Sequence, residues 1–245
     1  MTRRTACFLS PHLDDAVFSA GGTIARLLDD GWRCRVVTVF TRSVPDPTGF
    51  ALACQTDKGL AADVDYMALR RAEDAAACRT LGVPAEDIVH LDLPEAPHRG
   101  YTSAADLFAG MHDDDRPTTV AVAGAVRPFV DADRVYLPLG LGDHVDHLHV
   151  IAAAEELGVG THRWQDTPYA NRCPPGTLTQ GQPVDIAATL GRKLDACAAY
   201  VTQLPFQFGG EPAMREVLTR QARATAGGDG LAERFHARRE APAGG

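Results

Sequence analysis

The chain has 245 residues, of which 45% are hydrophobic and 23% are charged, as is usual for a globular protein. Its formal net charge of −8 gives no electrostatic reason to bind nucleic acid or an anionic membrane. No stretch approaches the ~18 apolar residues of a membrane span, and Pro11 interrupts the apolar run near the start. The six cysteines form no CxxC pair, which predicts reduced thiols and a cytoplasmic protein.

The start of the chain predicts a strand–helix–strand unit. Residues 6–10 are a short apolar run, 16–28 carry apolar residues at helical spacing, and 33–40 alternate and are rich in β-branched residues. Gly31 ends the helix, and a right-handed crossover between parallel strands is expected. Residues 43–65 are rich in Pro, Gly, Asp and Thr, which predicts a long surface loop of the kind that often acts as a lid.

Strands and helices continue to alternate along the rest of the chain. This alternation predicts an α/β fold, a three-layer sandwich with a mainly parallel sheet and helices on both faces. No repeat or linker is visible, so residues 1–245 are expected to form a single domain with a flexible tail from about residue 236. The further expected elements are helices over 66–81, 118–130, 144–157, 185–201 and 211–226, strands over 88–91, 134–139 and 161–164, and loops over 94–102 and 174–183.

A cluster of polar residues follows the first predicted strand, in the sequence Ser10-Pro11-His12-Leu13-Asp14-Asp15. Ligands of open α/β sheets bind beyond the carboxyl ends of the strands, so this cluster would bring an imidazole and two carboxylates to such a site. Each residue alone has another explanation. His12 could be a hydrogen-bonded residue at a strand end, and the two aspartates could be first-turn acids favoured by the helix dipole.

A second cluster, His144-Val145-Asp146-His147, follows the fourth predicted strand. It could be the solvated start of a helix, but two such clusters at strand ends together favour a metal site. His12, Asp15 and His147 supply two nitrogens and one oxygen, the three ligands that catalytic zinc commonly takes from a protein. Zinc is the expected cofactor, and ferrous iron would fit the same ligands.

The remaining polar residues of the two clusters predict a hydrolase. Because Asp14 and Asp15 are adjacent, they cannot easily point the same way, so Asp14 is free to act as general base on a water at the metal. His144 is expected to stabilise the oxyanion as an imidazolium, and Asp146 to orient a histidine. Either Asp14 or His144 could protonate the leaving amine.

Both clusters resemble the signature motifs of a known family, the PIG-L/LmbE-like zinc-dependent N-deacetylases. The first motif is Pro11-His12-Leu13-Asp14-Asp15 with Gly21-Gly22, and the second is His144-Val145-Asp146-His147. The resemblance extends over nearly the whole chain. Its supporting segments are Arg70-Arg71-Ala72-Glu73, Gln165-Asp166-Thr167-Pro168-Tyr169-Ala170 and the spaced residues Lys193, Tyr200 and Gln203.

The resemblance implies a Rossmann-like fold and removal of an N-acetyl or other N-acyl group from a small polar substrate, an amino sugar glycoside or natural-product intermediate. It implies the same ligands and the same base as the residues themselves, and substrate contacts from Arg70 and Tyr169. Arg70 could instead form a helix salt bridge with Glu73 or Asp74. Many members carry Glu where this chain has Ala16, which indicates a subgroup with a different substrate.

Three other functions share some of these sequence features. A thiol-conjugate amidase would cleave a glucosamine–cysteine amide with the same groups, and a metal-stabilised sugar-binding protein would lack turnover. A nucleotide-binding Rossmann protein does not fit, because Gly21-Gly22 is not part of a G-x-G-x-x-G pattern. The expected partner is a small molecule rather than nucleic acid or membrane, and a homo-oligomer is compatible with the sequence.

Overall fold

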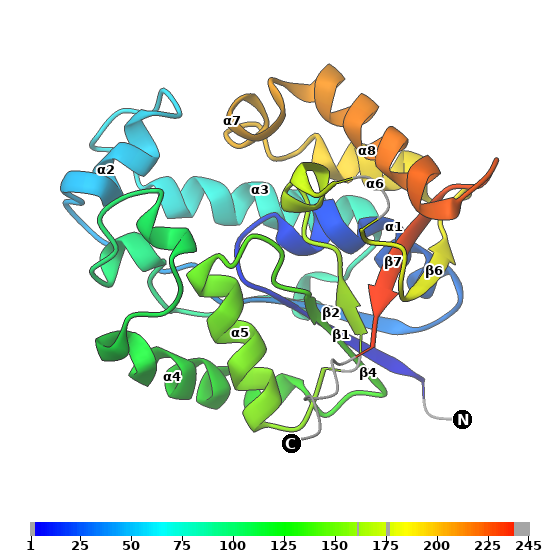
Figure 1. Cartoon of the computed structure of the whole chain (residues 1–245), viewed down its shortest axis with the longest axis horizontal. Helices are drawn as coiled ribbons and strands as arrows, with labels where there is room; N and C mark the ends of the chain where they lie inside the picture. The colour runs from blue at the N-terminus through cyan, green and yellow to red at the C-terminus, as the bar shows by residue number, and fades with distance from the viewer. Residues whose placement is uncertain (1–2, 161, 175–176, 238–245) are drawn as a thin grey trace.

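The computed structural model describes residues 3–160, 162–174 and 177–237. Within these ranges a seven-stranded sheet has the order β3-β2-β1-β4-β5-β7-β6, with helices packed on both faces (Figure 1). The first five strands are parallel, and the last two extend the sheet as antiparallel strands. The strands are β1 Thr5–Ser10, β2 Arg33–Thr38, β3 Ile88–His90, β4 Arg134–Pro138, β5 His162–Trp164, β6 Gln182–Asp185 and β7 Ala232–His236. The predicted α/β sandwich with a mainly parallel sheet is confirmed.

Helices fill the connections between the strands. The α-helices are α1 Asp15–Asp29, α2 Gly49–Thr56, α3 Tyr66–Leu81, α4 Arg116–Val126, α5 Val145–Glu156, α6 Leu190–Cys197, α7 Leu204–Phe208 and α8 Glu211–Ala226. Short 3₁₀ turns are η1 Ala85–Asp87, η2 Ala96–His98, η3 Asp106–Phe108, η4 Asp113–Asp115, η5 Arg127–Phe129 and η6 Tyr169–Arg172. No helix in the described part of the chain combines the length and apolarity needed to cross a bilayer. All six cysteines are free thiols.

The alternation of side chains along β1 divides the core into two layers. Ala6 and Phe8 belong to the apolar cluster that includes α1, α3, α6 and α8, whereas Cys7 and Leu9 belong to the cluster that includes α4 and α5. All four side chains are at most 2% exposed. A strand buried on both faces reads as a continuous apolar run, which is why β1 could be predicted from sequence.

The structure differs from the predictions mainly in the C-terminal part and in the 43–65 segment. Helix α2 lies in the segment predicted to be a loop, and α6 begins at Leu190 rather than at residue 185. Strand β6 carries Pro183 and exposed side chains, as an edge strand can, so it lacks the apolar alternation that marks a strand. Residue 236 ends β7 rather than starting the tail; residues 238–245, and Thr161 of the predicted fifth strand, lie outside the described residues.

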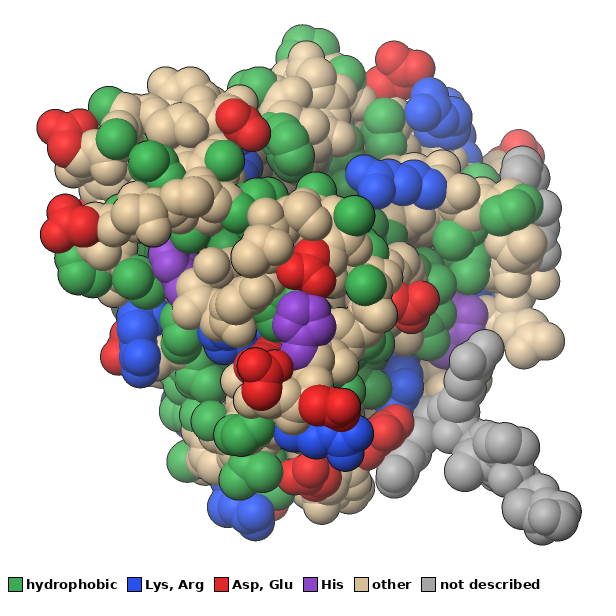
Figure 2. Space-filling view, turned by 60° about the vertical axis from the view of Figure 1, so that its left-hand side comes forward, with side chains coloured by type: hydrophobic (Ala, Val, Ile, Leu, Met, Phe, Trp, Pro, Cys, Tyr) green, Lys and Arg blue, Asp and Glu red, His purple; other side chains and the backbone are tan. Residues whose placement is uncertain are grey.

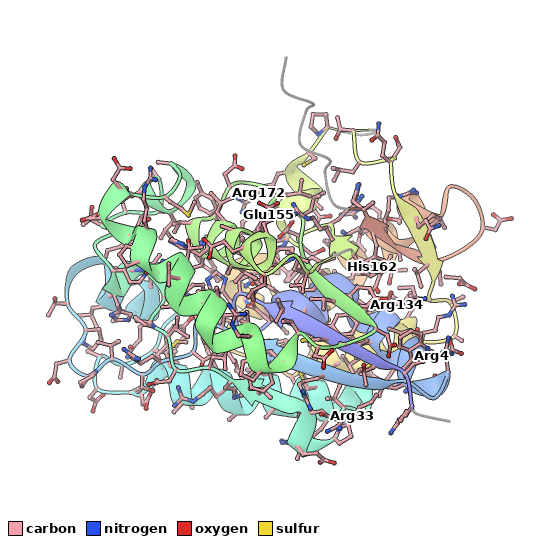
Figure 3. All side chains as sticks on the ribbon, turned by 90° about the horizontal axis from the view of Figure 1, so that it is seen from below. Arg4, Arg33, Arg134, Glu155, His162 and Arg172 are labelled. Carbon is pink, nitrogen blue, oxygen red and sulfur yellow. The ribbon has the colours of Figure 1, made fainter. Side chains whose placement is uncertain are left out.

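The strand order places two neighbouring parallel strands, β1 and β4, at the point where the winding of the sheet reverses. In open α/β sheets this point, at the carboxyl ends of the strands, is where ligands bind. Both polar clusters follow these two strands, so the fold brings them together. The opposite edge of the sheet carries basic residues at or near strand starts, among them Arg4, Arg33 and Arg134 (Figure 3).

Candidate metal centre and active site

Three side chains from distant parts of the sequence converge beyond β1 and β4. His12 follows β1, Asp15 begins α1, and His147 lies in the first turn of α5. Asp15 Oδ2 is 3.2 Å from His12 Nδ1 and 3.2 Å from His147 Nε2. The two imidazole centroids are 5.3 Å apart, so both rings face the same small volume. Of the described residues, these three form one of the groups that are close enough to hold a metal ion.

The other nitrogen of each imidazole is bound to a buried carboxylate. His12 Nε2 donates to Asp146 Oδ2 at 2.9 Å, and His147 Nδ1 donates to Asp166 Oδ1 at 2.8 Å. Histidines that ligate a metal commonly donate their second N–H to a carboxylate, which fixes the tautomer and the ring orientation. In the neutral rings, these hydrogen bonds leave His12 Nδ1 and His147 Nε2, the two nitrogens beside Asp15, with their lone pairs directed at the shared volume.

The geometry of this site fits a divalent cation. Ligand atoms about 2.1 Å from a tetrahedral zinc ion lie about 3.4 Å from one another, close to the 3.2 Å observed from Asp15 to each histidine. His147 Nε2 is buried and accepts or donates no hydrogen bond among the described residues. Burial disfavours the imidazolium of His147, but Asp15 and Asp166 outweigh it and raise its pKa to about 9. A proton therefore competes with a cation for this nitrogen.

Asp166 links the metal-site histidine to the loop that precedes α5. Its Oδ2 accepts hydrogen bonds from the backbone N–H groups of Gly140 and Leu141, at 2.9 and 3.0 Å. Gly140 has φ +88°, and a Cβ there would lie 2.8 Å from Ile151, so this tight turn requires glycine. Asp166 follows β5 at the same sheet edge as the two clusters, so the rule that locates those clusters also locates this residue.

Asp14 lines the same pocket as Asp15 but contacts different partners. Its Oδ2 accepts a hydrogen bond of 2.8 Å from Gln207 Nε2 and lies 3.7 Å from Arg70 Nη2. Burial raises the pKa of the Asp14 carboxyl to about 7, although the Arg70 guanidinium opposes the shift. A carboxyl group with a pKa near 7 can both accept and return a proton at neutral pH. Gln207 was missed by sequence analysis, because nothing in the sequence around α7 indicates that it reaches this site.

His144 lies beside the three converging residues and is the N-cap of α5. Its Nδ1 accepts a hydrogen bond of 3.2 Å from the backbone N–H of Asp146, which leaves Nε2 as the nitrogen that carries hydrogen. Burial and the neighbouring His12 lower the pKa of His144 to about 3. This arrangement does not fit the imidazolium predicted from the sequence, since a doubly protonated ring has no nitrogen free to accept the N–H. The neutral ring can still donate a hydrogen bond to an oxyanion.

Asp146 is tied to a buried charge network that sequence analysis did not find. Its Oδ1 lies 2.8 Å from Arg99 Nη2, and Arg99 binds Asp115 through both Nε and Nη2, at 3.0 to 3.3 Å. Asp115 also accepts a 2.8 Å hydrogen bond from His149 Nε2. Burial opposes ionisation of Asp146, yet His12 and Arg99 hold its pKa well below the usual range. The network thus keeps Asp146 anionic and fixed behind His12.

A pocket of about 490 Å³ opens over these residues, within the size range of small-molecule sites. Arg70 and Tyr169, the predicted substrate contacts, both line it. The buried Arg70 forms a salt bridge with Glu95, from the segment after β3, and not with the helix neighbours that were the alternative. Glu73 instead accepts two hydrogen bonds from Thr202. Arg70 is therefore held at the pocket wall beside Asp14.

Comparisons with known proteins identify the family of the chain. A family model described as PIG-L: GlcNAc-PI de-N-acetylase matches residues 7–157. A 2′-N-acetylparomamine deacetylase of Streptomyces fradiae is 32% identical over 196 residues, which cover 78% of this chain but only 63% of that relative. The structure of a deacetylase–bog complex from the teicoplanin biosynthesis pathway is 27% identical, with a TM-score of 0.81 over 97% of this chain and 100% of that one. The zinc-inhibited form of a teicoplanin deacetylase is 26% identical, with a TM-score of 0.80 over the same shares.

Proposed function

The chain belongs to the PIG-L family, and we propose that it is a metal-dependent hydrolase that removes an N-acetyl or other N-acyl group from an amino sugar glycoside or a related natural-product intermediate. The observation that carries this proposal is the convergence of His12, Asp15 and His147, with the Asp14 carboxyl group lining the same pocket. The deacetylase names of the relatives support the same reaction. We further propose that residues 1–245 form one domain and that the protein acts in the cytoplasm.

We propose that His12 Nδ1, Asp15 Oδ2 and His147 Nε2 hold the metal. Two nitrogens and one oxygen suit zinc, and the same donors would accept ferrous iron. When bound, such an ion supplies Lewis acidity for the attack of water on an amide carbonyl. Asp146 and Asp166 hold the two imidazoles in the tautomers that this role needs.

The protein side chains then divide the proton transfers between them. Asp14, with a pKa of about 7, takes a proton from the attacking water. His144 donates a hydrogen bond from Nε2 to the oxygen of the scissile amide as negative charge develops there. Because His144 is neutral and its Nδ1 is occupied, we assign to Asp14 the return of a proton to the leaving amine. Arg70 and Tyr169 line the pocket where they can position the sugar.

The test is hydrolysis of N-acetylglucosamine glycosides by the purified protein, followed as acetate release. Removal of metal with a chelator should abolish turnover, and stoichiometric Zn²⁺ or Fe²⁺ should restore it. The cysteinyl amide of the same amino sugar separates a deacetylase from a thiol-conjugate amidase. Full turnover after the metal is stripped, or no amide hydrolysis by metal-loaded protein, would overturn the proposal.

A further inference from the structure

The mouth of the pocket is lined by aromatic side chains from four separate segments. We call Phe50 of α2, Phe108 of η3, Tyr169 of η6 and Phe206 of α7 the aromatic mouth. The Phe108 ring lies 5.2 Å from the His144 ring and 5.7 Å from that of Tyr169, so the mouth is continuous with the catalytic residues. Phe206 is 69% exposed and Phe108 is 37% exposed. Large aromatic side chains left in solvent around a pocket commonly mark a surface that binds a partner or ligand.

The exposure of Phe206 is not explained by the packing of its helix. In α7 the neighbouring Phe208 packs on Phe18 of α1, with ring centroids 5.1 Å apart, and Leu204 is only 4% exposed. Gln207 reaches Asp14 in the catalytic site. These contacts anchor the helix to the core and to the site, whereas Pro205 and Phe206 stay exposed. The fold therefore keeps an aromatic ring at the pocket entrance without using it in the core.

The charges of the pocket disfavour a polycationic ligand. Four of the five carboxylates that line it are already paired: Asp14 with Gln207 and Arg70, Asp15 with two histidines, Glu95 with Arg70, and Asp146 with His12 and Arg99. Of the lining carboxylates, only Asp57 has no ion pair within the described ranges.

Two cations stand at the same entrance. The Lys58 ammonium lies 5.0 Å from the Phe206 ring centroid and 5.1 Å from that of Tyr66, so it is held against the aromatic mouth. Arg172, labelled in Figure 3, lies over Tyr169 at 5.6 Å and forms no ion pair among the described residues. On the face shown in Figure 2, acidic and basic side chains lie interspersed, with no broad patch of one sign. The local excess of positive charge at the mouth is therefore a property of the entrance itself.

We propose that the aromatic mouth binds an aromatic aglycone without positive charge, attached to the N-acylated sugar whose amide reaches the catalytic site. The inference rests on the proposed function and deepens it by naming the substrate class. Flat rings of the aglycone would stack on Phe206 and Phe108. This stacking buries apolar area and restricts little side-chain freedom. A carboxylate on the aglycone would meet Lys58 and Arg172, whereas ammonium groups would be repelled by them.

The first experiment compares p-nitrophenyl and methyl N-acetyl-β-D-glucosaminides, which share the sugar and the scissile amide. We expect kcat/KM for the p-nitrophenyl glycoside to exceed that for the methyl glycoside by about tenfold or more, because the aryl ring is buried against the aromatic mouth. Phe206→Ala should lower this aryl-to-methyl ratio roughly 2- to 10-fold. The control Val201→Ala removes another side chain that is 68% exposed but does not line the pocket, and it should leave the ratio unchanged.

A second comparison tests the charge preference with 4-carboxyphenyl and 4-(aminomethyl)phenyl glycosides of the same sugar. We expect a higher kcat/KM for the 4-carboxyphenyl glycoside than for the 4-(aminomethyl)phenyl glycoside. Arg172→Gln should reduce the ratio of these two kcat/KM values. Equal hydrolysis of aryl and methyl glycosides, a preference for the cationic glycoside, or a ratio unaffected by Phe206→Ala would overturn the inference while the proposed function stands. If metal-loaded protein hydrolyses none of these amides, the proposed function itself fails.

Discussion

The floor and the mouth of the pocket are built in opposite ways. The floor consists of buried charged groups at the ends of β1, β4 and β5, each bound to a partner of opposite charge or to a hydrogen-bond donor. The mouth consists of two exposed rings, Phe108 and Phe206, two half-buried rings, Phe50 and Tyr169, and the cations of Lys58 and Arg172. Buried charges need fixed partners, so the floor tolerates little change, whereas rings in solvent can be exchanged without unfolding the protein.

This difference assigns separate tasks to the two regions. We expect changes in the floor to alter metal binding and the rate of hydrolysis for every substrate. Changes at the mouth should alter the choice among substrates with little effect on metal binding. A floor variant that alters only substrate choice, or a mouth variant that alters metal binding, would contradict this division.

The largest effect is expected for Asp14→Asn. The amide side chain can still accept a hydrogen bond from Gln207, but it cannot take a proton from water. Turnover of all substrates should fall roughly 10²- to 10⁴-fold, the usual contribution of general acid–base catalysis. Metal content, measured by elemental analysis, should stay at one ion per chain. The control Asp30→Asn changes an exposed carboxylate at the other end of α1 and should have no effect.

A somewhat smaller loss is expected for His144→Ala. Loss of one donor to an oxyanion typically lowers kcat by about 10²- to 10³-fold, and KM should change much less. The aryl-to-methyl ratio set by the mouth should persist in this variant, because both glycosides share the scissile amide. Unimpaired kcat, or loss of the metal, would show that His144 has another role.

Arg99→Met tests whether the buried network behind His12 acts through the metal site. The change leaves Asp146 without its cation, so metal affinity should fall roughly 10- to 100-fold, as for other residues that support metal ligands. Arg99→Lys should recover part of the loss. Competition with a chromophoric chelator gives the affinity.

Arg33→Met is the matched control, because Arg33 also pairs with a buried aspartate, Asp87, but at the opposite edge of the sheet. It should lower thermal stability without weakening metal binding. Equal metal loss in both variants would mean that Arg99 acts only through general stability.

The smallest effect is expected for a change of one pH unit, which alters the metal affinity. In the metal-free protein the pKa of His147 is about 9, so below that pH a proton must leave before the metal binds. Metal affinity should therefore fall as the pH is lowered from 9 to 6, by about tenfold per pH unit for each proton released. Titration calorimetry in buffers of different ionisation enthalpy counts those protons. Affinity that is constant over this range would contradict the proposed ligand state of His147.

The sequence predicted the floor because two simple rules applied to it. Buried parallel strands appear as continuous apolar runs, and polar residues directly after such runs meet at one sheet edge. His12, Asp15 and His147 followed from these rules, and the family resemblance of their motifs is confirmed. Asp166 obeys the same rule after β5 and was overlooked.

The mouth and the network behind the floor could not be predicted in the same way. Arg99 and Gln207 come from a loop and a one-turn helix, and nothing in their neighbouring residues shows which distant carboxylate they reach. Phe206 looks like an ordinary apolar residue until its exposure is seen. Strands β6 and β7 were missed because both are short and carry polar or charged side chains between their apolar residues, so neither shows a clear apolar period.

The most direct test of the central proposal is anomalous X-ray diffraction at the zinc absorption edge from crystals grown with stoichiometric Zn²⁺. We predict one strong anomalous peak within bonding distance of His12 Nδ1, Asp15 Oδ2 and His147 Nε2. A well-ordered site with no peak there, or a peak held only by other residues, would contradict the account.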